Sequence, residues 1–164
     1  MDDQRIRLLQ AMPFFGGVSE EVLALLLERV KPVFVAKGEY FFREGNRGAS
    51  AFILEEGRVS ILKGWRGRSY FLRHLEAGDC IGEVALMDFS PRSASVLADE
   101  DCRAIELSTA DLHQVASKSL EQFAMIYMNI GRELSRRLRE ADERAFRHRV
   151  EAGDITTALP GHES

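Results

Sequence analysis

The sequence has few of the residues that build covalent cross-links or metal sites. Its two cysteines, Cys80 and Cys102, lack the CxxC spacing of zinc and redox motifs. Two unclustered cysteines are typical of a protein from a reducing compartment. The four histidines are scattered, and three of them lie outside the segment that we expect to form strands. We therefore expect no metal ligands, no catalytic residues, no catalytic cofactor and no enzymatic activity.

The sequence also lacks the signals of membrane and secreted proteins. No apolar run is long enough to cross a bilayer, and the N-terminal MDDQ has acids where a signal peptide carries bases. We therefore expect a cytoplasmic protein without a membrane partner. The formal net charge of −4 argues against direct DNA binding, because duplex affinity depends on a basic surface. The basic stretch 132–149 contains Glu133, Glu140 and Glu143, which predicts ion pairs along a solvated helix.

The chain is apolar enough, at 45% hydrophobic residues, to form one folded core. Helices are predicted over 1–32, where Ile6, Leu8 and Leu9 fall on one side of a first helix and Ser19 begins a second. Over 33–108, glycines separate short apolar or alternating runs, a pattern typical of antiparallel strands joined by turns. We therefore expect a mainly β fold with flanking helices (α+β), built as an antiparallel β-roll or jelly roll.

The C-terminal part returns to a helical pattern. We expect helices over 109–150, with a capping sequence at Ser108, and a flexible tail over 151–164. A heptad-like seam runs along the long final helix, and its members are Phe123, Tyr127, Ile130, Leu134, Leu138, Ala141 and Ala145. This seam can pack against the β-roll or against a second copy. Because the helix is longer than one small roll can cover, we favour a homodimer through it.

The segment 80–98, CIGEVALMDFSPRSASVLA, contains a short helix start suited to an anion. Gly82 precedes one or two helical turns, and it permits close approach of the backbone to a ligand. The first N–H groups of such a helix lack intrahelical acceptors, and together with the helix dipole they favour negative charge. Val84 and Ala85 occupy this first turn, and the small Ala85 keeps side-chain bulk away from a ligand.

Charged side chains lie at both ends of this short helix. Arg92 can bind two phosphate oxygens through its planar guanidinium, and Ser93 adds a hydroxyl and a backbone donor. Glu83 would be repelled by a phosphate, but it can accept a hydrogen bond from a neighbouring sugar hydroxyl. The pattern predicts a site for a compact nucleotide. Taken singly, an arginine or a Gly-Glu pair is more often a solvated side chain or a turn.

The stretch I-G-E-V-A-L-M-D-F-S-P-R-S-A-S-V resembles the phosphate-binding cassette of the cyclic nucleotide-binding domain family, which has the form F-G-E-L-A-L followed by P-R-x-A. KGEYFFREGNRGASAFILEEGRVSIL is similar to the family's first strands, and RHLEAGDCIGE to its approach to the cassette. The resemblance covers about residues 6–139 and places the cassette at 81–95. It implies a β-roll over 33–108 and a C-terminal helix that closes over the base.

The resemblance also implies roles for individual residues. Arg92 would hold the cyclic phosphate and Glu83 the ribose 2′-hydroxyl. Backbone donors that assist Arg92 would come from Gly82, Val84, Ala85 and Ser93. Residues that would line the pocket or meet the base are Ile61, Leu72, Arg73, Ile81, Arg137 and Asp142. The implied ligand is cAMP or cGMP: family frequency favours cAMP, whereas an arginine and an aspartate beside the base suit guanine.

The function implied by the resemblance is that of a receptor. Movement of its C-terminal helix would signal the cyclic nucleotide level to a separate effector protein. Only about fifteen residues follow Arg149, too few for a helix-turn-helix unit, so we expect a stand-alone domain. Two alternatives stay open: a ligand-independent interaction scaffold on the same fold, and a sensor fragment of a larger transcription regulator.

Overall fold

The computed structural model describes residues 3–153. The chain divides into two compact units, Met1–Ile130 and Gly131–Ser164. The first unit contains two antiparallel sheets and most of the helices, and the second contains the C-terminal part of one long helix. Within residues 3–153, no helix combines the length and the apolar character needed to cross a bilayer.

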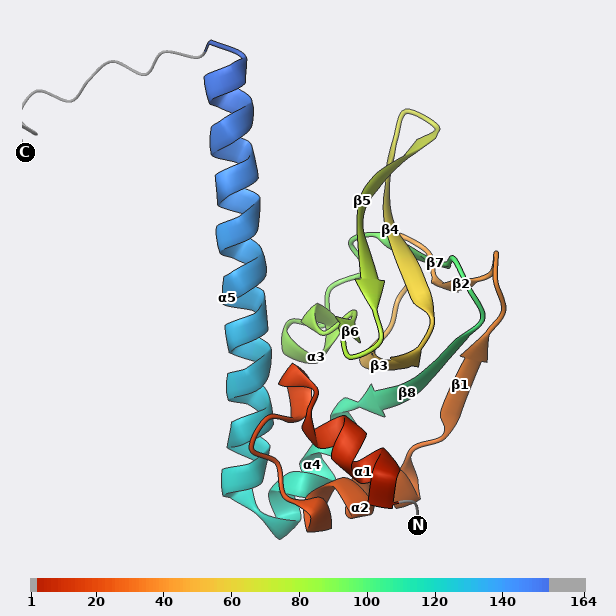
Figure 1. The fold of residues 1–164 in the computed structure, drawn as a ribbon, viewed down its shortest axis with the longest axis vertical. Helices are drawn as coiled ribbons and strands as arrows, with labels where there is room; N and C mark the ends of the chain where they lie inside the picture. Colours follow the sequence, from red (N-terminus) through yellow and green to blue (C-terminus); the bar gives the residue numbers. More distant parts are fainter. Residues whose placement is uncertain (1–2, 154–164) are drawn as a thin grey trace, which may run out of the picture. The chain divides into compact units, whose positions relative to one another are not determined.

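Two four-stranded sheets form the roll of the first unit (Figure 1). Their strand orders are β1-β8-β3-β6 and β2-β7-β4-β5, and every pairing is antiparallel. The strands are β1 Pro32–Val35, β2 Tyr40–Phe42, β3 Ser50–Glu56, β4 Arg58–Trp65, β5 Arg68–Glu76, β6 Cys80–Ile81, β7 Ser95–Ala98 and β8 Cys102–Ser108. This arrangement confirms the predicted antiparallel roll with flanking helices, because the turn signals between short apolar runs fall between successive strands.

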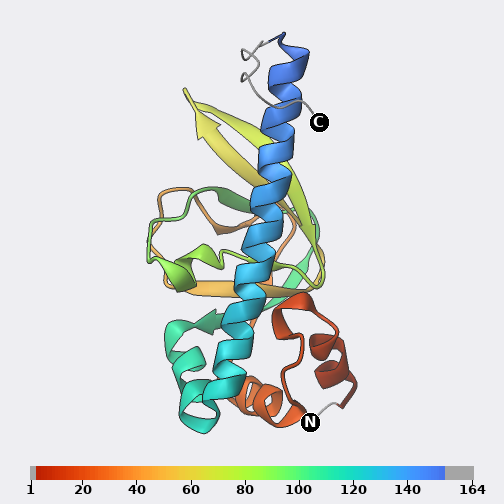
Figure 2. The same ribbon diagram turned by 90° about the vertical axis from the view of Figure 1, so that its left-hand side faces the viewer.

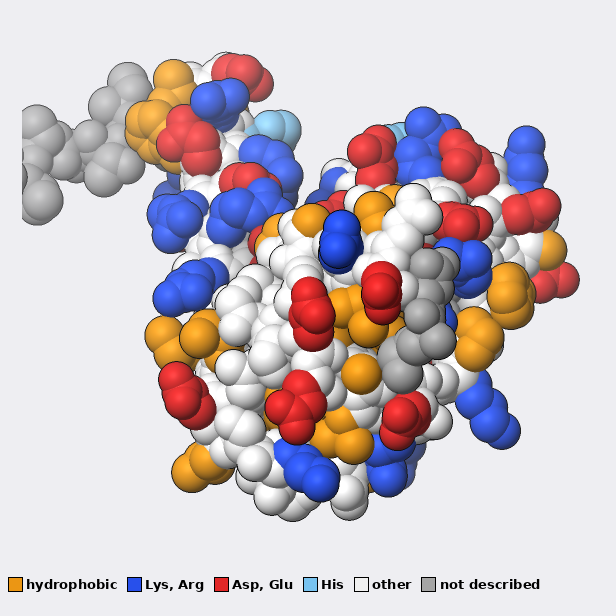
Figure 3. All heavy atoms as spheres, turned by 60° about the horizontal axis from the view of Figure 1, so that its bottom comes forward, with side chains coloured by type: hydrophobic (Ala, Val, Ile, Leu, Met, Phe, Trp, Pro, Cys, Tyr) orange, Lys and Arg blue, Asp and Glu red, His pale blue; other side chains and the backbone are white. Residues whose placement is uncertain are grey.

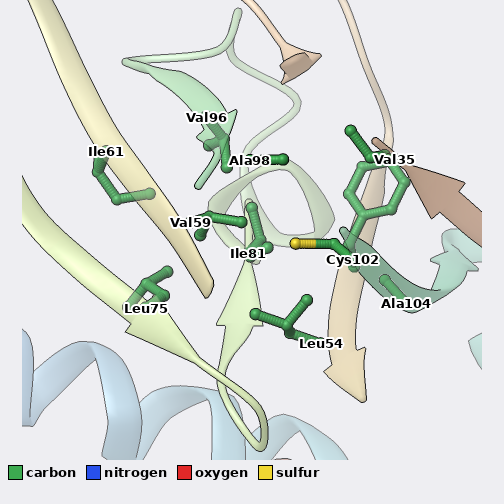
Figure 4. Packing of buried hydrophobic residues seen from close by; sticks show 11 residues of the cluster. Val35, Leu54, Val59, Ile61, Leu75, Ile81, Val96, Ala98, Cys102 and Ala104 are labelled. Carbon is green, nitrogen blue, oxygen red and sulfur yellow. The ribbon is translucent and has the colours of Figure 1, made fainter. Parts of the chain in front are cut away.

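The core of the roll lies between the two sheets, as Figure 4 shows for side chains from both of them. Val59 and Ile61 come from β4, and Leu54 and Ile81 come from β3 and β6 of the other sheet. All four are buried, and Phe42 packs against the same cluster while staying partly exposed. The cluster matters for the site because it supports the strands on either side of the cassette.

The helices α1 Asp3–Gln10, α2 Glu20–Arg29 and α4 Thr109–Lys118 gather at one end of the two sheets (Figures 1 and 2). The Ser19 hydroxyl accepts a hydrogen bond from the Val22 N–H at 3.3 Å, so the predicted cap of α2 is present. Ser108 begins α4 with a complete capping box. One detail of the helical prediction is wrong: Leu8 is exposed, because the buried side of α1 carries Ile6 and Leu9 instead.

The long helix α5 spans Leu120–Glu151 and crosses the boundary between the units. In the first unit, Ile126, Asn129 and Ile130 are buried. The Asn129 side-chain amide donates to the carbonyl oxygens of Phe14 and Gly16 at 3.0 and 2.9 Å, next to the 3-10 helix η1 Pro13–Phe15. Of these three buried residues only Ile130 belongs to the predicted seam, so the buried side of α5 in the first unit also includes Ile126 and Asn129, which the seam did not.

In the second unit, most described side chains of α5 are exposed. Ion pairs of i,i+3 and i,i+4 spacing join Arg136 to Glu133 and Glu140, Arg137 to Glu133, and Arg147 to Glu143. Figure 3 shows basic and acidic side chains mixed along this part of the helix. Arg136, Arg137 and Arg147 are thus ion-paired along the helix, as the sequence predicts for this stretch.

A two-stranded hairpin of β4 and β5 extends beyond the rest of the roll (Figures 1 and 2). Strand β7 pairs only with residues 59–62 of β4, so the outer part of the hairpin is a free ribbon. Its turn is made by Arg66 and Gly67, both with positive φ (48° and 75°), as in a two-residue type I′ turn. A bulge follows Ile61, and Leu72 is the extra residue on β5. The tip presents the exposed Trp65.

Candidate functional site

The segment between β6 and β7 forms a compact loop around the four-residue helix α3, Val84–Met87. Gly82 is the first residue of this loop and has φ +73°, a backbone conformation that residues with a side chain rarely adopt. The Ala85 N–H donates to the Gly82 carbonyl at 3.1 Å, and the Leu86 N–H donates to the Glu83 carbonyl at 3.0 Å. The N–H of Val84, at the first helical position, is one of the donors that a helix leaves without an intrahelical acceptor.

Arg92 lies inside this loop instead of projecting into solvent, with only 7% of its surface exposed. Its guanidinium carbon is 4.0 Å from the centre of the Phe42 ring, and Nη1 donates to the Gly82 carbonyl at 3.3 Å. Its Nε–H is buried without a hydrogen-bond acceptor among residues 3–153. Burial lowers the pKa of the Arg92 guanidinium, while the negative charge of Glu106 acts in the opposite direction.

The turn between β2 and β3 holds Arg92 in this position. The Gly45 N–H donates to the Arg92 carbonyl at 2.8 Å, and the Arg92 N–H donates to the Asn46 carbonyl at 2.9 Å. Gly48 leaves room for the guanidinium, because a Cβ on Gly48 would lie 2.6 Å from Nη2 of Arg92. Phe42, Asn46 and Gly48 are not among the residues predicted from the sequence. The closely spaced glycines 45 and 48 after a predicted strand are the only signal for them.

Glu83 lies at the N-cap position of α3 and is 2% exposed. A carboxylate is rarely buried so deeply unless other groups stabilise its charge. The positive end of the short helix, where Glu83 lies, is favourable for this charge. Buried glutamate and buried arginine on one short segment give the loop both an acceptor and a cation.

Val84 and Ser93 lie at the surface of the loop, whereas Ala85 is buried. The Ser93 carbonyl accepts a hydrogen bond from Nζ of Lys63 at 2.6 Å. Because the Ala85 N–H already bonds to Gly82, an anion at this helix start would share or replace that bond. The cassette thus brings Gly82, Glu83, Val84, Ala85, Arg92 and Ser93 together on one loop.

A family model described as "Cyclic nucleotide-binding domain" matches residues 32–119, which is more than half of the chain. The chain belongs to this family. The match includes the whole β-roll, the cassette and α4. The predicted resemblance is therefore confirmed at the level of the family and of its fold.

Known relatives of this cyclic nucleotide-binding domain include a protein kinase and a cyclic AMP receptor protein. The human cGMP-dependent protein kinase 2 is 26% identical over 142 residues, covering 83% of this chain and 19% of the kinase. The cyclic AMP receptor protein of Thermus thermophilus is 28% identical over 135 residues, covering 82% of this chain and 61% of that protein. The chain thus spans less than two thirds of both relatives.

The fold of this domain also matches solved structures. A cyclic nucleotide-binding domain from Methylobacillus flagellatus superposes with a TM-score of 0.77 at 20% identity. The superposition covers 96% of this chain and 86% of that chain. At this identity the likeness shows the shared architecture of two sheets and flanking helices.

The residues predicted to line the pocket lie in different environments. Ile61 and Ile81 are buried in the core cluster, which also contacts the Phe42 ring beneath Arg92. Arg73 pairs directly with Ile61 across β4 and β5, so its side chain shares the inner face of the hairpin. Leu72 is the bulge residue and is about half exposed. Ile61 and Ile81 therefore belong to the interior of the roll, whereas Leu72 is partly open to solvent.

Arg137 and Asp142, the predicted base contacts from the C-terminal helix, belong to the second unit. Nε of Arg137 donates to Glu133 at 3.0 Å, and Asp142 is exposed. Their roles toward a base therefore stay predictions.

A serine and a histidine of the hairpin, Ser60 and His74, also meet an aspartate that directly follows β7, Asp99. The Ser60 hydroxyl donates to both carboxylate oxygens of Asp99 at 2.8 and 2.9 Å, and Nδ1 of His74 lies 3.1 Å from the same carboxylate. In a nucleophilic triad the histidine stands between the hydroxyl and the acid. Here one nitrogen, Nδ1 of His74, lies 3.4 Å from the Ser60 hydroxyl as well as beside the acid, and the hydroxyl donates to the carboxylate instead. Within residues 3–153, no group of three His, Cys, Asp or Glu side chains is placed to hold a metal ion.

A groove of about 810 Å³ lies elsewhere in the first unit, between α1, β1 and the turn after β5. Its lining includes Leu8, Phe34 and the ion-paired Arg5, Glu55 and Arg103. None of its lining residues belongs to the cassette. We do not assign the nucleotide to this groove, because the buried cation and the buried carboxylate, Arg92 and Glu83, lie on the cassette and not in its lining.

Proposed function

We propose that this protein binds a cyclic mononucleotide, with cAMP as the first candidate and cGMP as the alternative. Arg92 holds the cyclic phosphate and Glu83 accepts a hydrogen bond from the ribose 2′-hydroxyl. One observation carries the proposal: the guanidinium of Arg92 is buried inside the cassette, and its Nε–H has no acceptor within residues 3–153.

Burying the positive charge of Arg92 costs free energy unless other groups compensate for the lost water. A guanidinium has five N–H donors, and that of Arg92 makes a single hydrogen bond, to Gly82, within the described chain. Desolvated cations are costly unless an anion and hydrogen bonds compensate. The planar fork suits two phosphate oxygens together. A phosphate beside Arg92 would therefore supply both the charge and the acceptors that this buried group needs.

The observations that bear on the base point to two different nucleotides. The two curated relatives are named for different ligands, a cGMP-dependent kinase and a cyclic AMP receptor. Arg73 on the inner face of the hairpin favours guanine, whose O6 and N7 accept a bidentate arginine. Family frequency favours adenine. A direct comparison of cAMP with cGMP is therefore part of the experiment.

The proposed role is regulatory and cytoplasmic, not catalytic. Ligand binding shifts α5 toward a position over the base, which requires unequal affinity of the ligand for the two arrangements. Exposed apolar residues of α5 in the second unit, such as Leu138 and Phe146, support pairing with a second copy. The moved helix, or the homodimer that it forms, then presents a surface to a separate effector protein. DNA and membranes are not among the proposed partners.

Isothermal titration calorimetry of the protein with cAMP and with cGMP tests the proposal. We expect micromolar or tighter binding of one nucleotide and a loss of more than ten-fold in Arg92→Ala, because charge-assisted hydrogen bonds to the phosphate are removed. Arg43→Ala is the matched control: its guanidinium carbon also lies 4.0 Å from a ring centre, that of Tyr40, but Arg43 is exposed. Near-normal affinity of Arg92→Ala would refute the site. No heat with either nucleotide would favour a ligand-independent scaffold.

A further inference from the structure

We infer that Lys63 is a positioning residue that connects the phosphate-binding cassette to the β4–β5 hairpin. This inference rests on the proposed function. It assigns to Lys63, which lies outside the cassette, an effect on the position of the cassette. The observation that carries it is a set of short contacts that one ammonium group makes to two separate segments.

Nζ of Lys63 donates to the Ser93 carbonyl at 2.6 Å and lies 2.8 Å from Oε1 of Glu44. The second oxygen of Glu44 accepts a hydrogen bond from the Gly64 N–H at 2.8 Å. The Glu44 N–H in turn donates to the Ser95 hydroxyl at 2.8 Å. Lys63 therefore lies at the centre of contacts that connect three segments: the base of the hairpin, the β2–β3 turn and the end of the cassette.

These contacts lie directly beside the two backbone bonds of Arg92. Gly45, the neighbour of Glu44, donates to the Arg92 carbonyl, and Ser93 follows Arg92 in the chain. A displacement of Arg92 toward a phosphate therefore moves a group that Lys63 holds. The hydrogen bond from Lys63 lowers the pKa of the Glu44 carboxyl, so Glu44 is charged at neutral pH and the connection persists.

The strength of the connection comes from its geometry and not from a single pair. One exposed ion pair contributes little, because solvent and side-chain entropy oppose it. Here the ammonium bonds a backbone carbonyl and a carboxylate at the same time, and the carboxylate is also held by a backbone N–H. Charge-assisted bonds of this kind restrict both partners. We therefore expect Lys63 to fix the Ser93 carbonyl, and with it the orientation of Arg92.

The hairpin contains its own reporter of this connection. Trp65 is the only tryptophan of the chain, and it is exposed at the tip. It lies two residues beyond Lys63 on β4, so the two side chains leave the same face of the strand. We expect a movement of the cassette that reaches Lys63 to change the surroundings of Trp65 on the same strand face. Its fluorescence therefore measures the coupling separately from the affinity.

The experiment compares Lys63→Met, Lys63→Arg and Glu44→Gln with the unmodified protein. Calorimetry gives the affinity for cAMP or cGMP, Trp65 emission is recorded with and without saturating nucleotide, and thermal unfolding checks the fold. We expect Trp65 emission of the unmodified protein to respond to the nucleotide. Lys63→Met should lose this response and bind about three- to ten-fold more weakly, whereas Lys63→Arg should restore both. Lys37→Met, an exposed lysine on the turn between β1 and β2, is the control that should change neither.

The outcomes separate the two proposals. If the unmodified protein binds neither nucleotide, the proposed function fails and the inference fails with it. If it binds but Lys63→Met keeps the affinity and the Trp65 response, or Trp65 never responds, the inference alone is overturned. If Lys63→Met does not fold, the result for Glu44→Gln decides. This variant keeps Lys63 and its hydrogen bond to the Ser93 carbonyl, but the side chain at position 44 loses its negative charge. A partial loss of the Trp65 response in Glu44→Gln supports the inference, and an unchanged response overturns it.

Discussion

Gly48→Ala tests how closely the β2–β3 turn fits the guanidinium of Arg92. The new Cβ would lie 2.6 Å from Nη2, 2.8 Å from Nε and 2.9 Å from Cζ of Arg92. Ordinary contacts begin at 3.4 Å, so the guanidinium must move by about 0.8 Å, the difference between 2.6 and 3.4 Å. Gly48 does not have a positive φ, so alanine adds no backbone strain at this position.

The expected result of Gly48→Ala is a loss of affinity without a loss of stability. A guanidinium displaced by this distance loses at least one well-aligned bond to the phosphate, which is worth about 1.5 kcal/mol or more and corresponds to roughly ten-fold weaker binding. The free energy of unfolding should change by less than about 1 kcal/mol, because replacing a glycine stiffens the unfolded chain. Calorimetry with the preferred nucleotide and urea unfolding measure the two quantities.

A double-mutant cycle with Arg92→Ala decides whether Gly48 acts through the guanidinium. If it does, Gly48→Ala should cost no further affinity in the Arg92→Ala background, because the two residues act through one contact. Additive losses would mean that Gly48 affects binding by another route. Wild-type affinity in Gly48→Ala would show that Arg92 binds its ligand from a different position.

Three further predictions concern the rest of the chain. Gly82→Ala should weaken binding and also lower the free energy of unfolding by about 1–2 kcal/mol in urea, because φ is +73° there. Asn129→Ala should cost about 1–3 kcal/mol in the same assay, since it removes two hydrogen bonds to backbone carbonyls at 3.0 and 2.9 Å. The hydrogen bond from Arg136 lowers the pKa of Glu133, so its stabilisation is present above the ordinary value of 4.5 and is lost as the pH falls through the lowered pKa. Far-UV circular dichroism should show α5 losing helicity in that acid range, and Glu133→Gln should remove this contribution.

Most of the fold could be predicted because its signals are local. Caps such as Ser19 and Ser108 identify helix starts, and both form the expected hydrogen bonds. Glycines between short apolar runs identify turns, and the two antiparallel sheets follow from them. The prediction that Leu8 shares the buried side of its helix is wrong. In a short helix with few apolar residues, the sequence pattern defines the buried side poorly.

The candidate site could be predicted only in part, for a physical reason. Gly82, Glu83 and Arg92 lie within one short segment, so their spacing is visible in the sequence. Phe42 and Gly48 contact Arg92 from a distant part of the chain, and only closure of the roll brings them there. In the sequence, a glycine that makes room for a remote side chain cannot be distinguished from a glycine that is needed only for a turn.

The two hydrogen bonds between Arg92 and the β2–β3 turn join segments that are far apart in the chain. The proposed phosphate site therefore requires the pairing of β2 with β7, and the unfolded chain would lack it. A nucleotide at a hundred times its dissociation constant would then add about 2.7 kcal/mol to the free energy of unfolding of the whole roll. Since proteases in the cell attack mainly unfolded chains, a sustained rise in the nucleotide would lengthen the lifetime of the protein. Under the proposed function, the cyclic nucleotide would thereby set the abundance of this protein as well as its conformation.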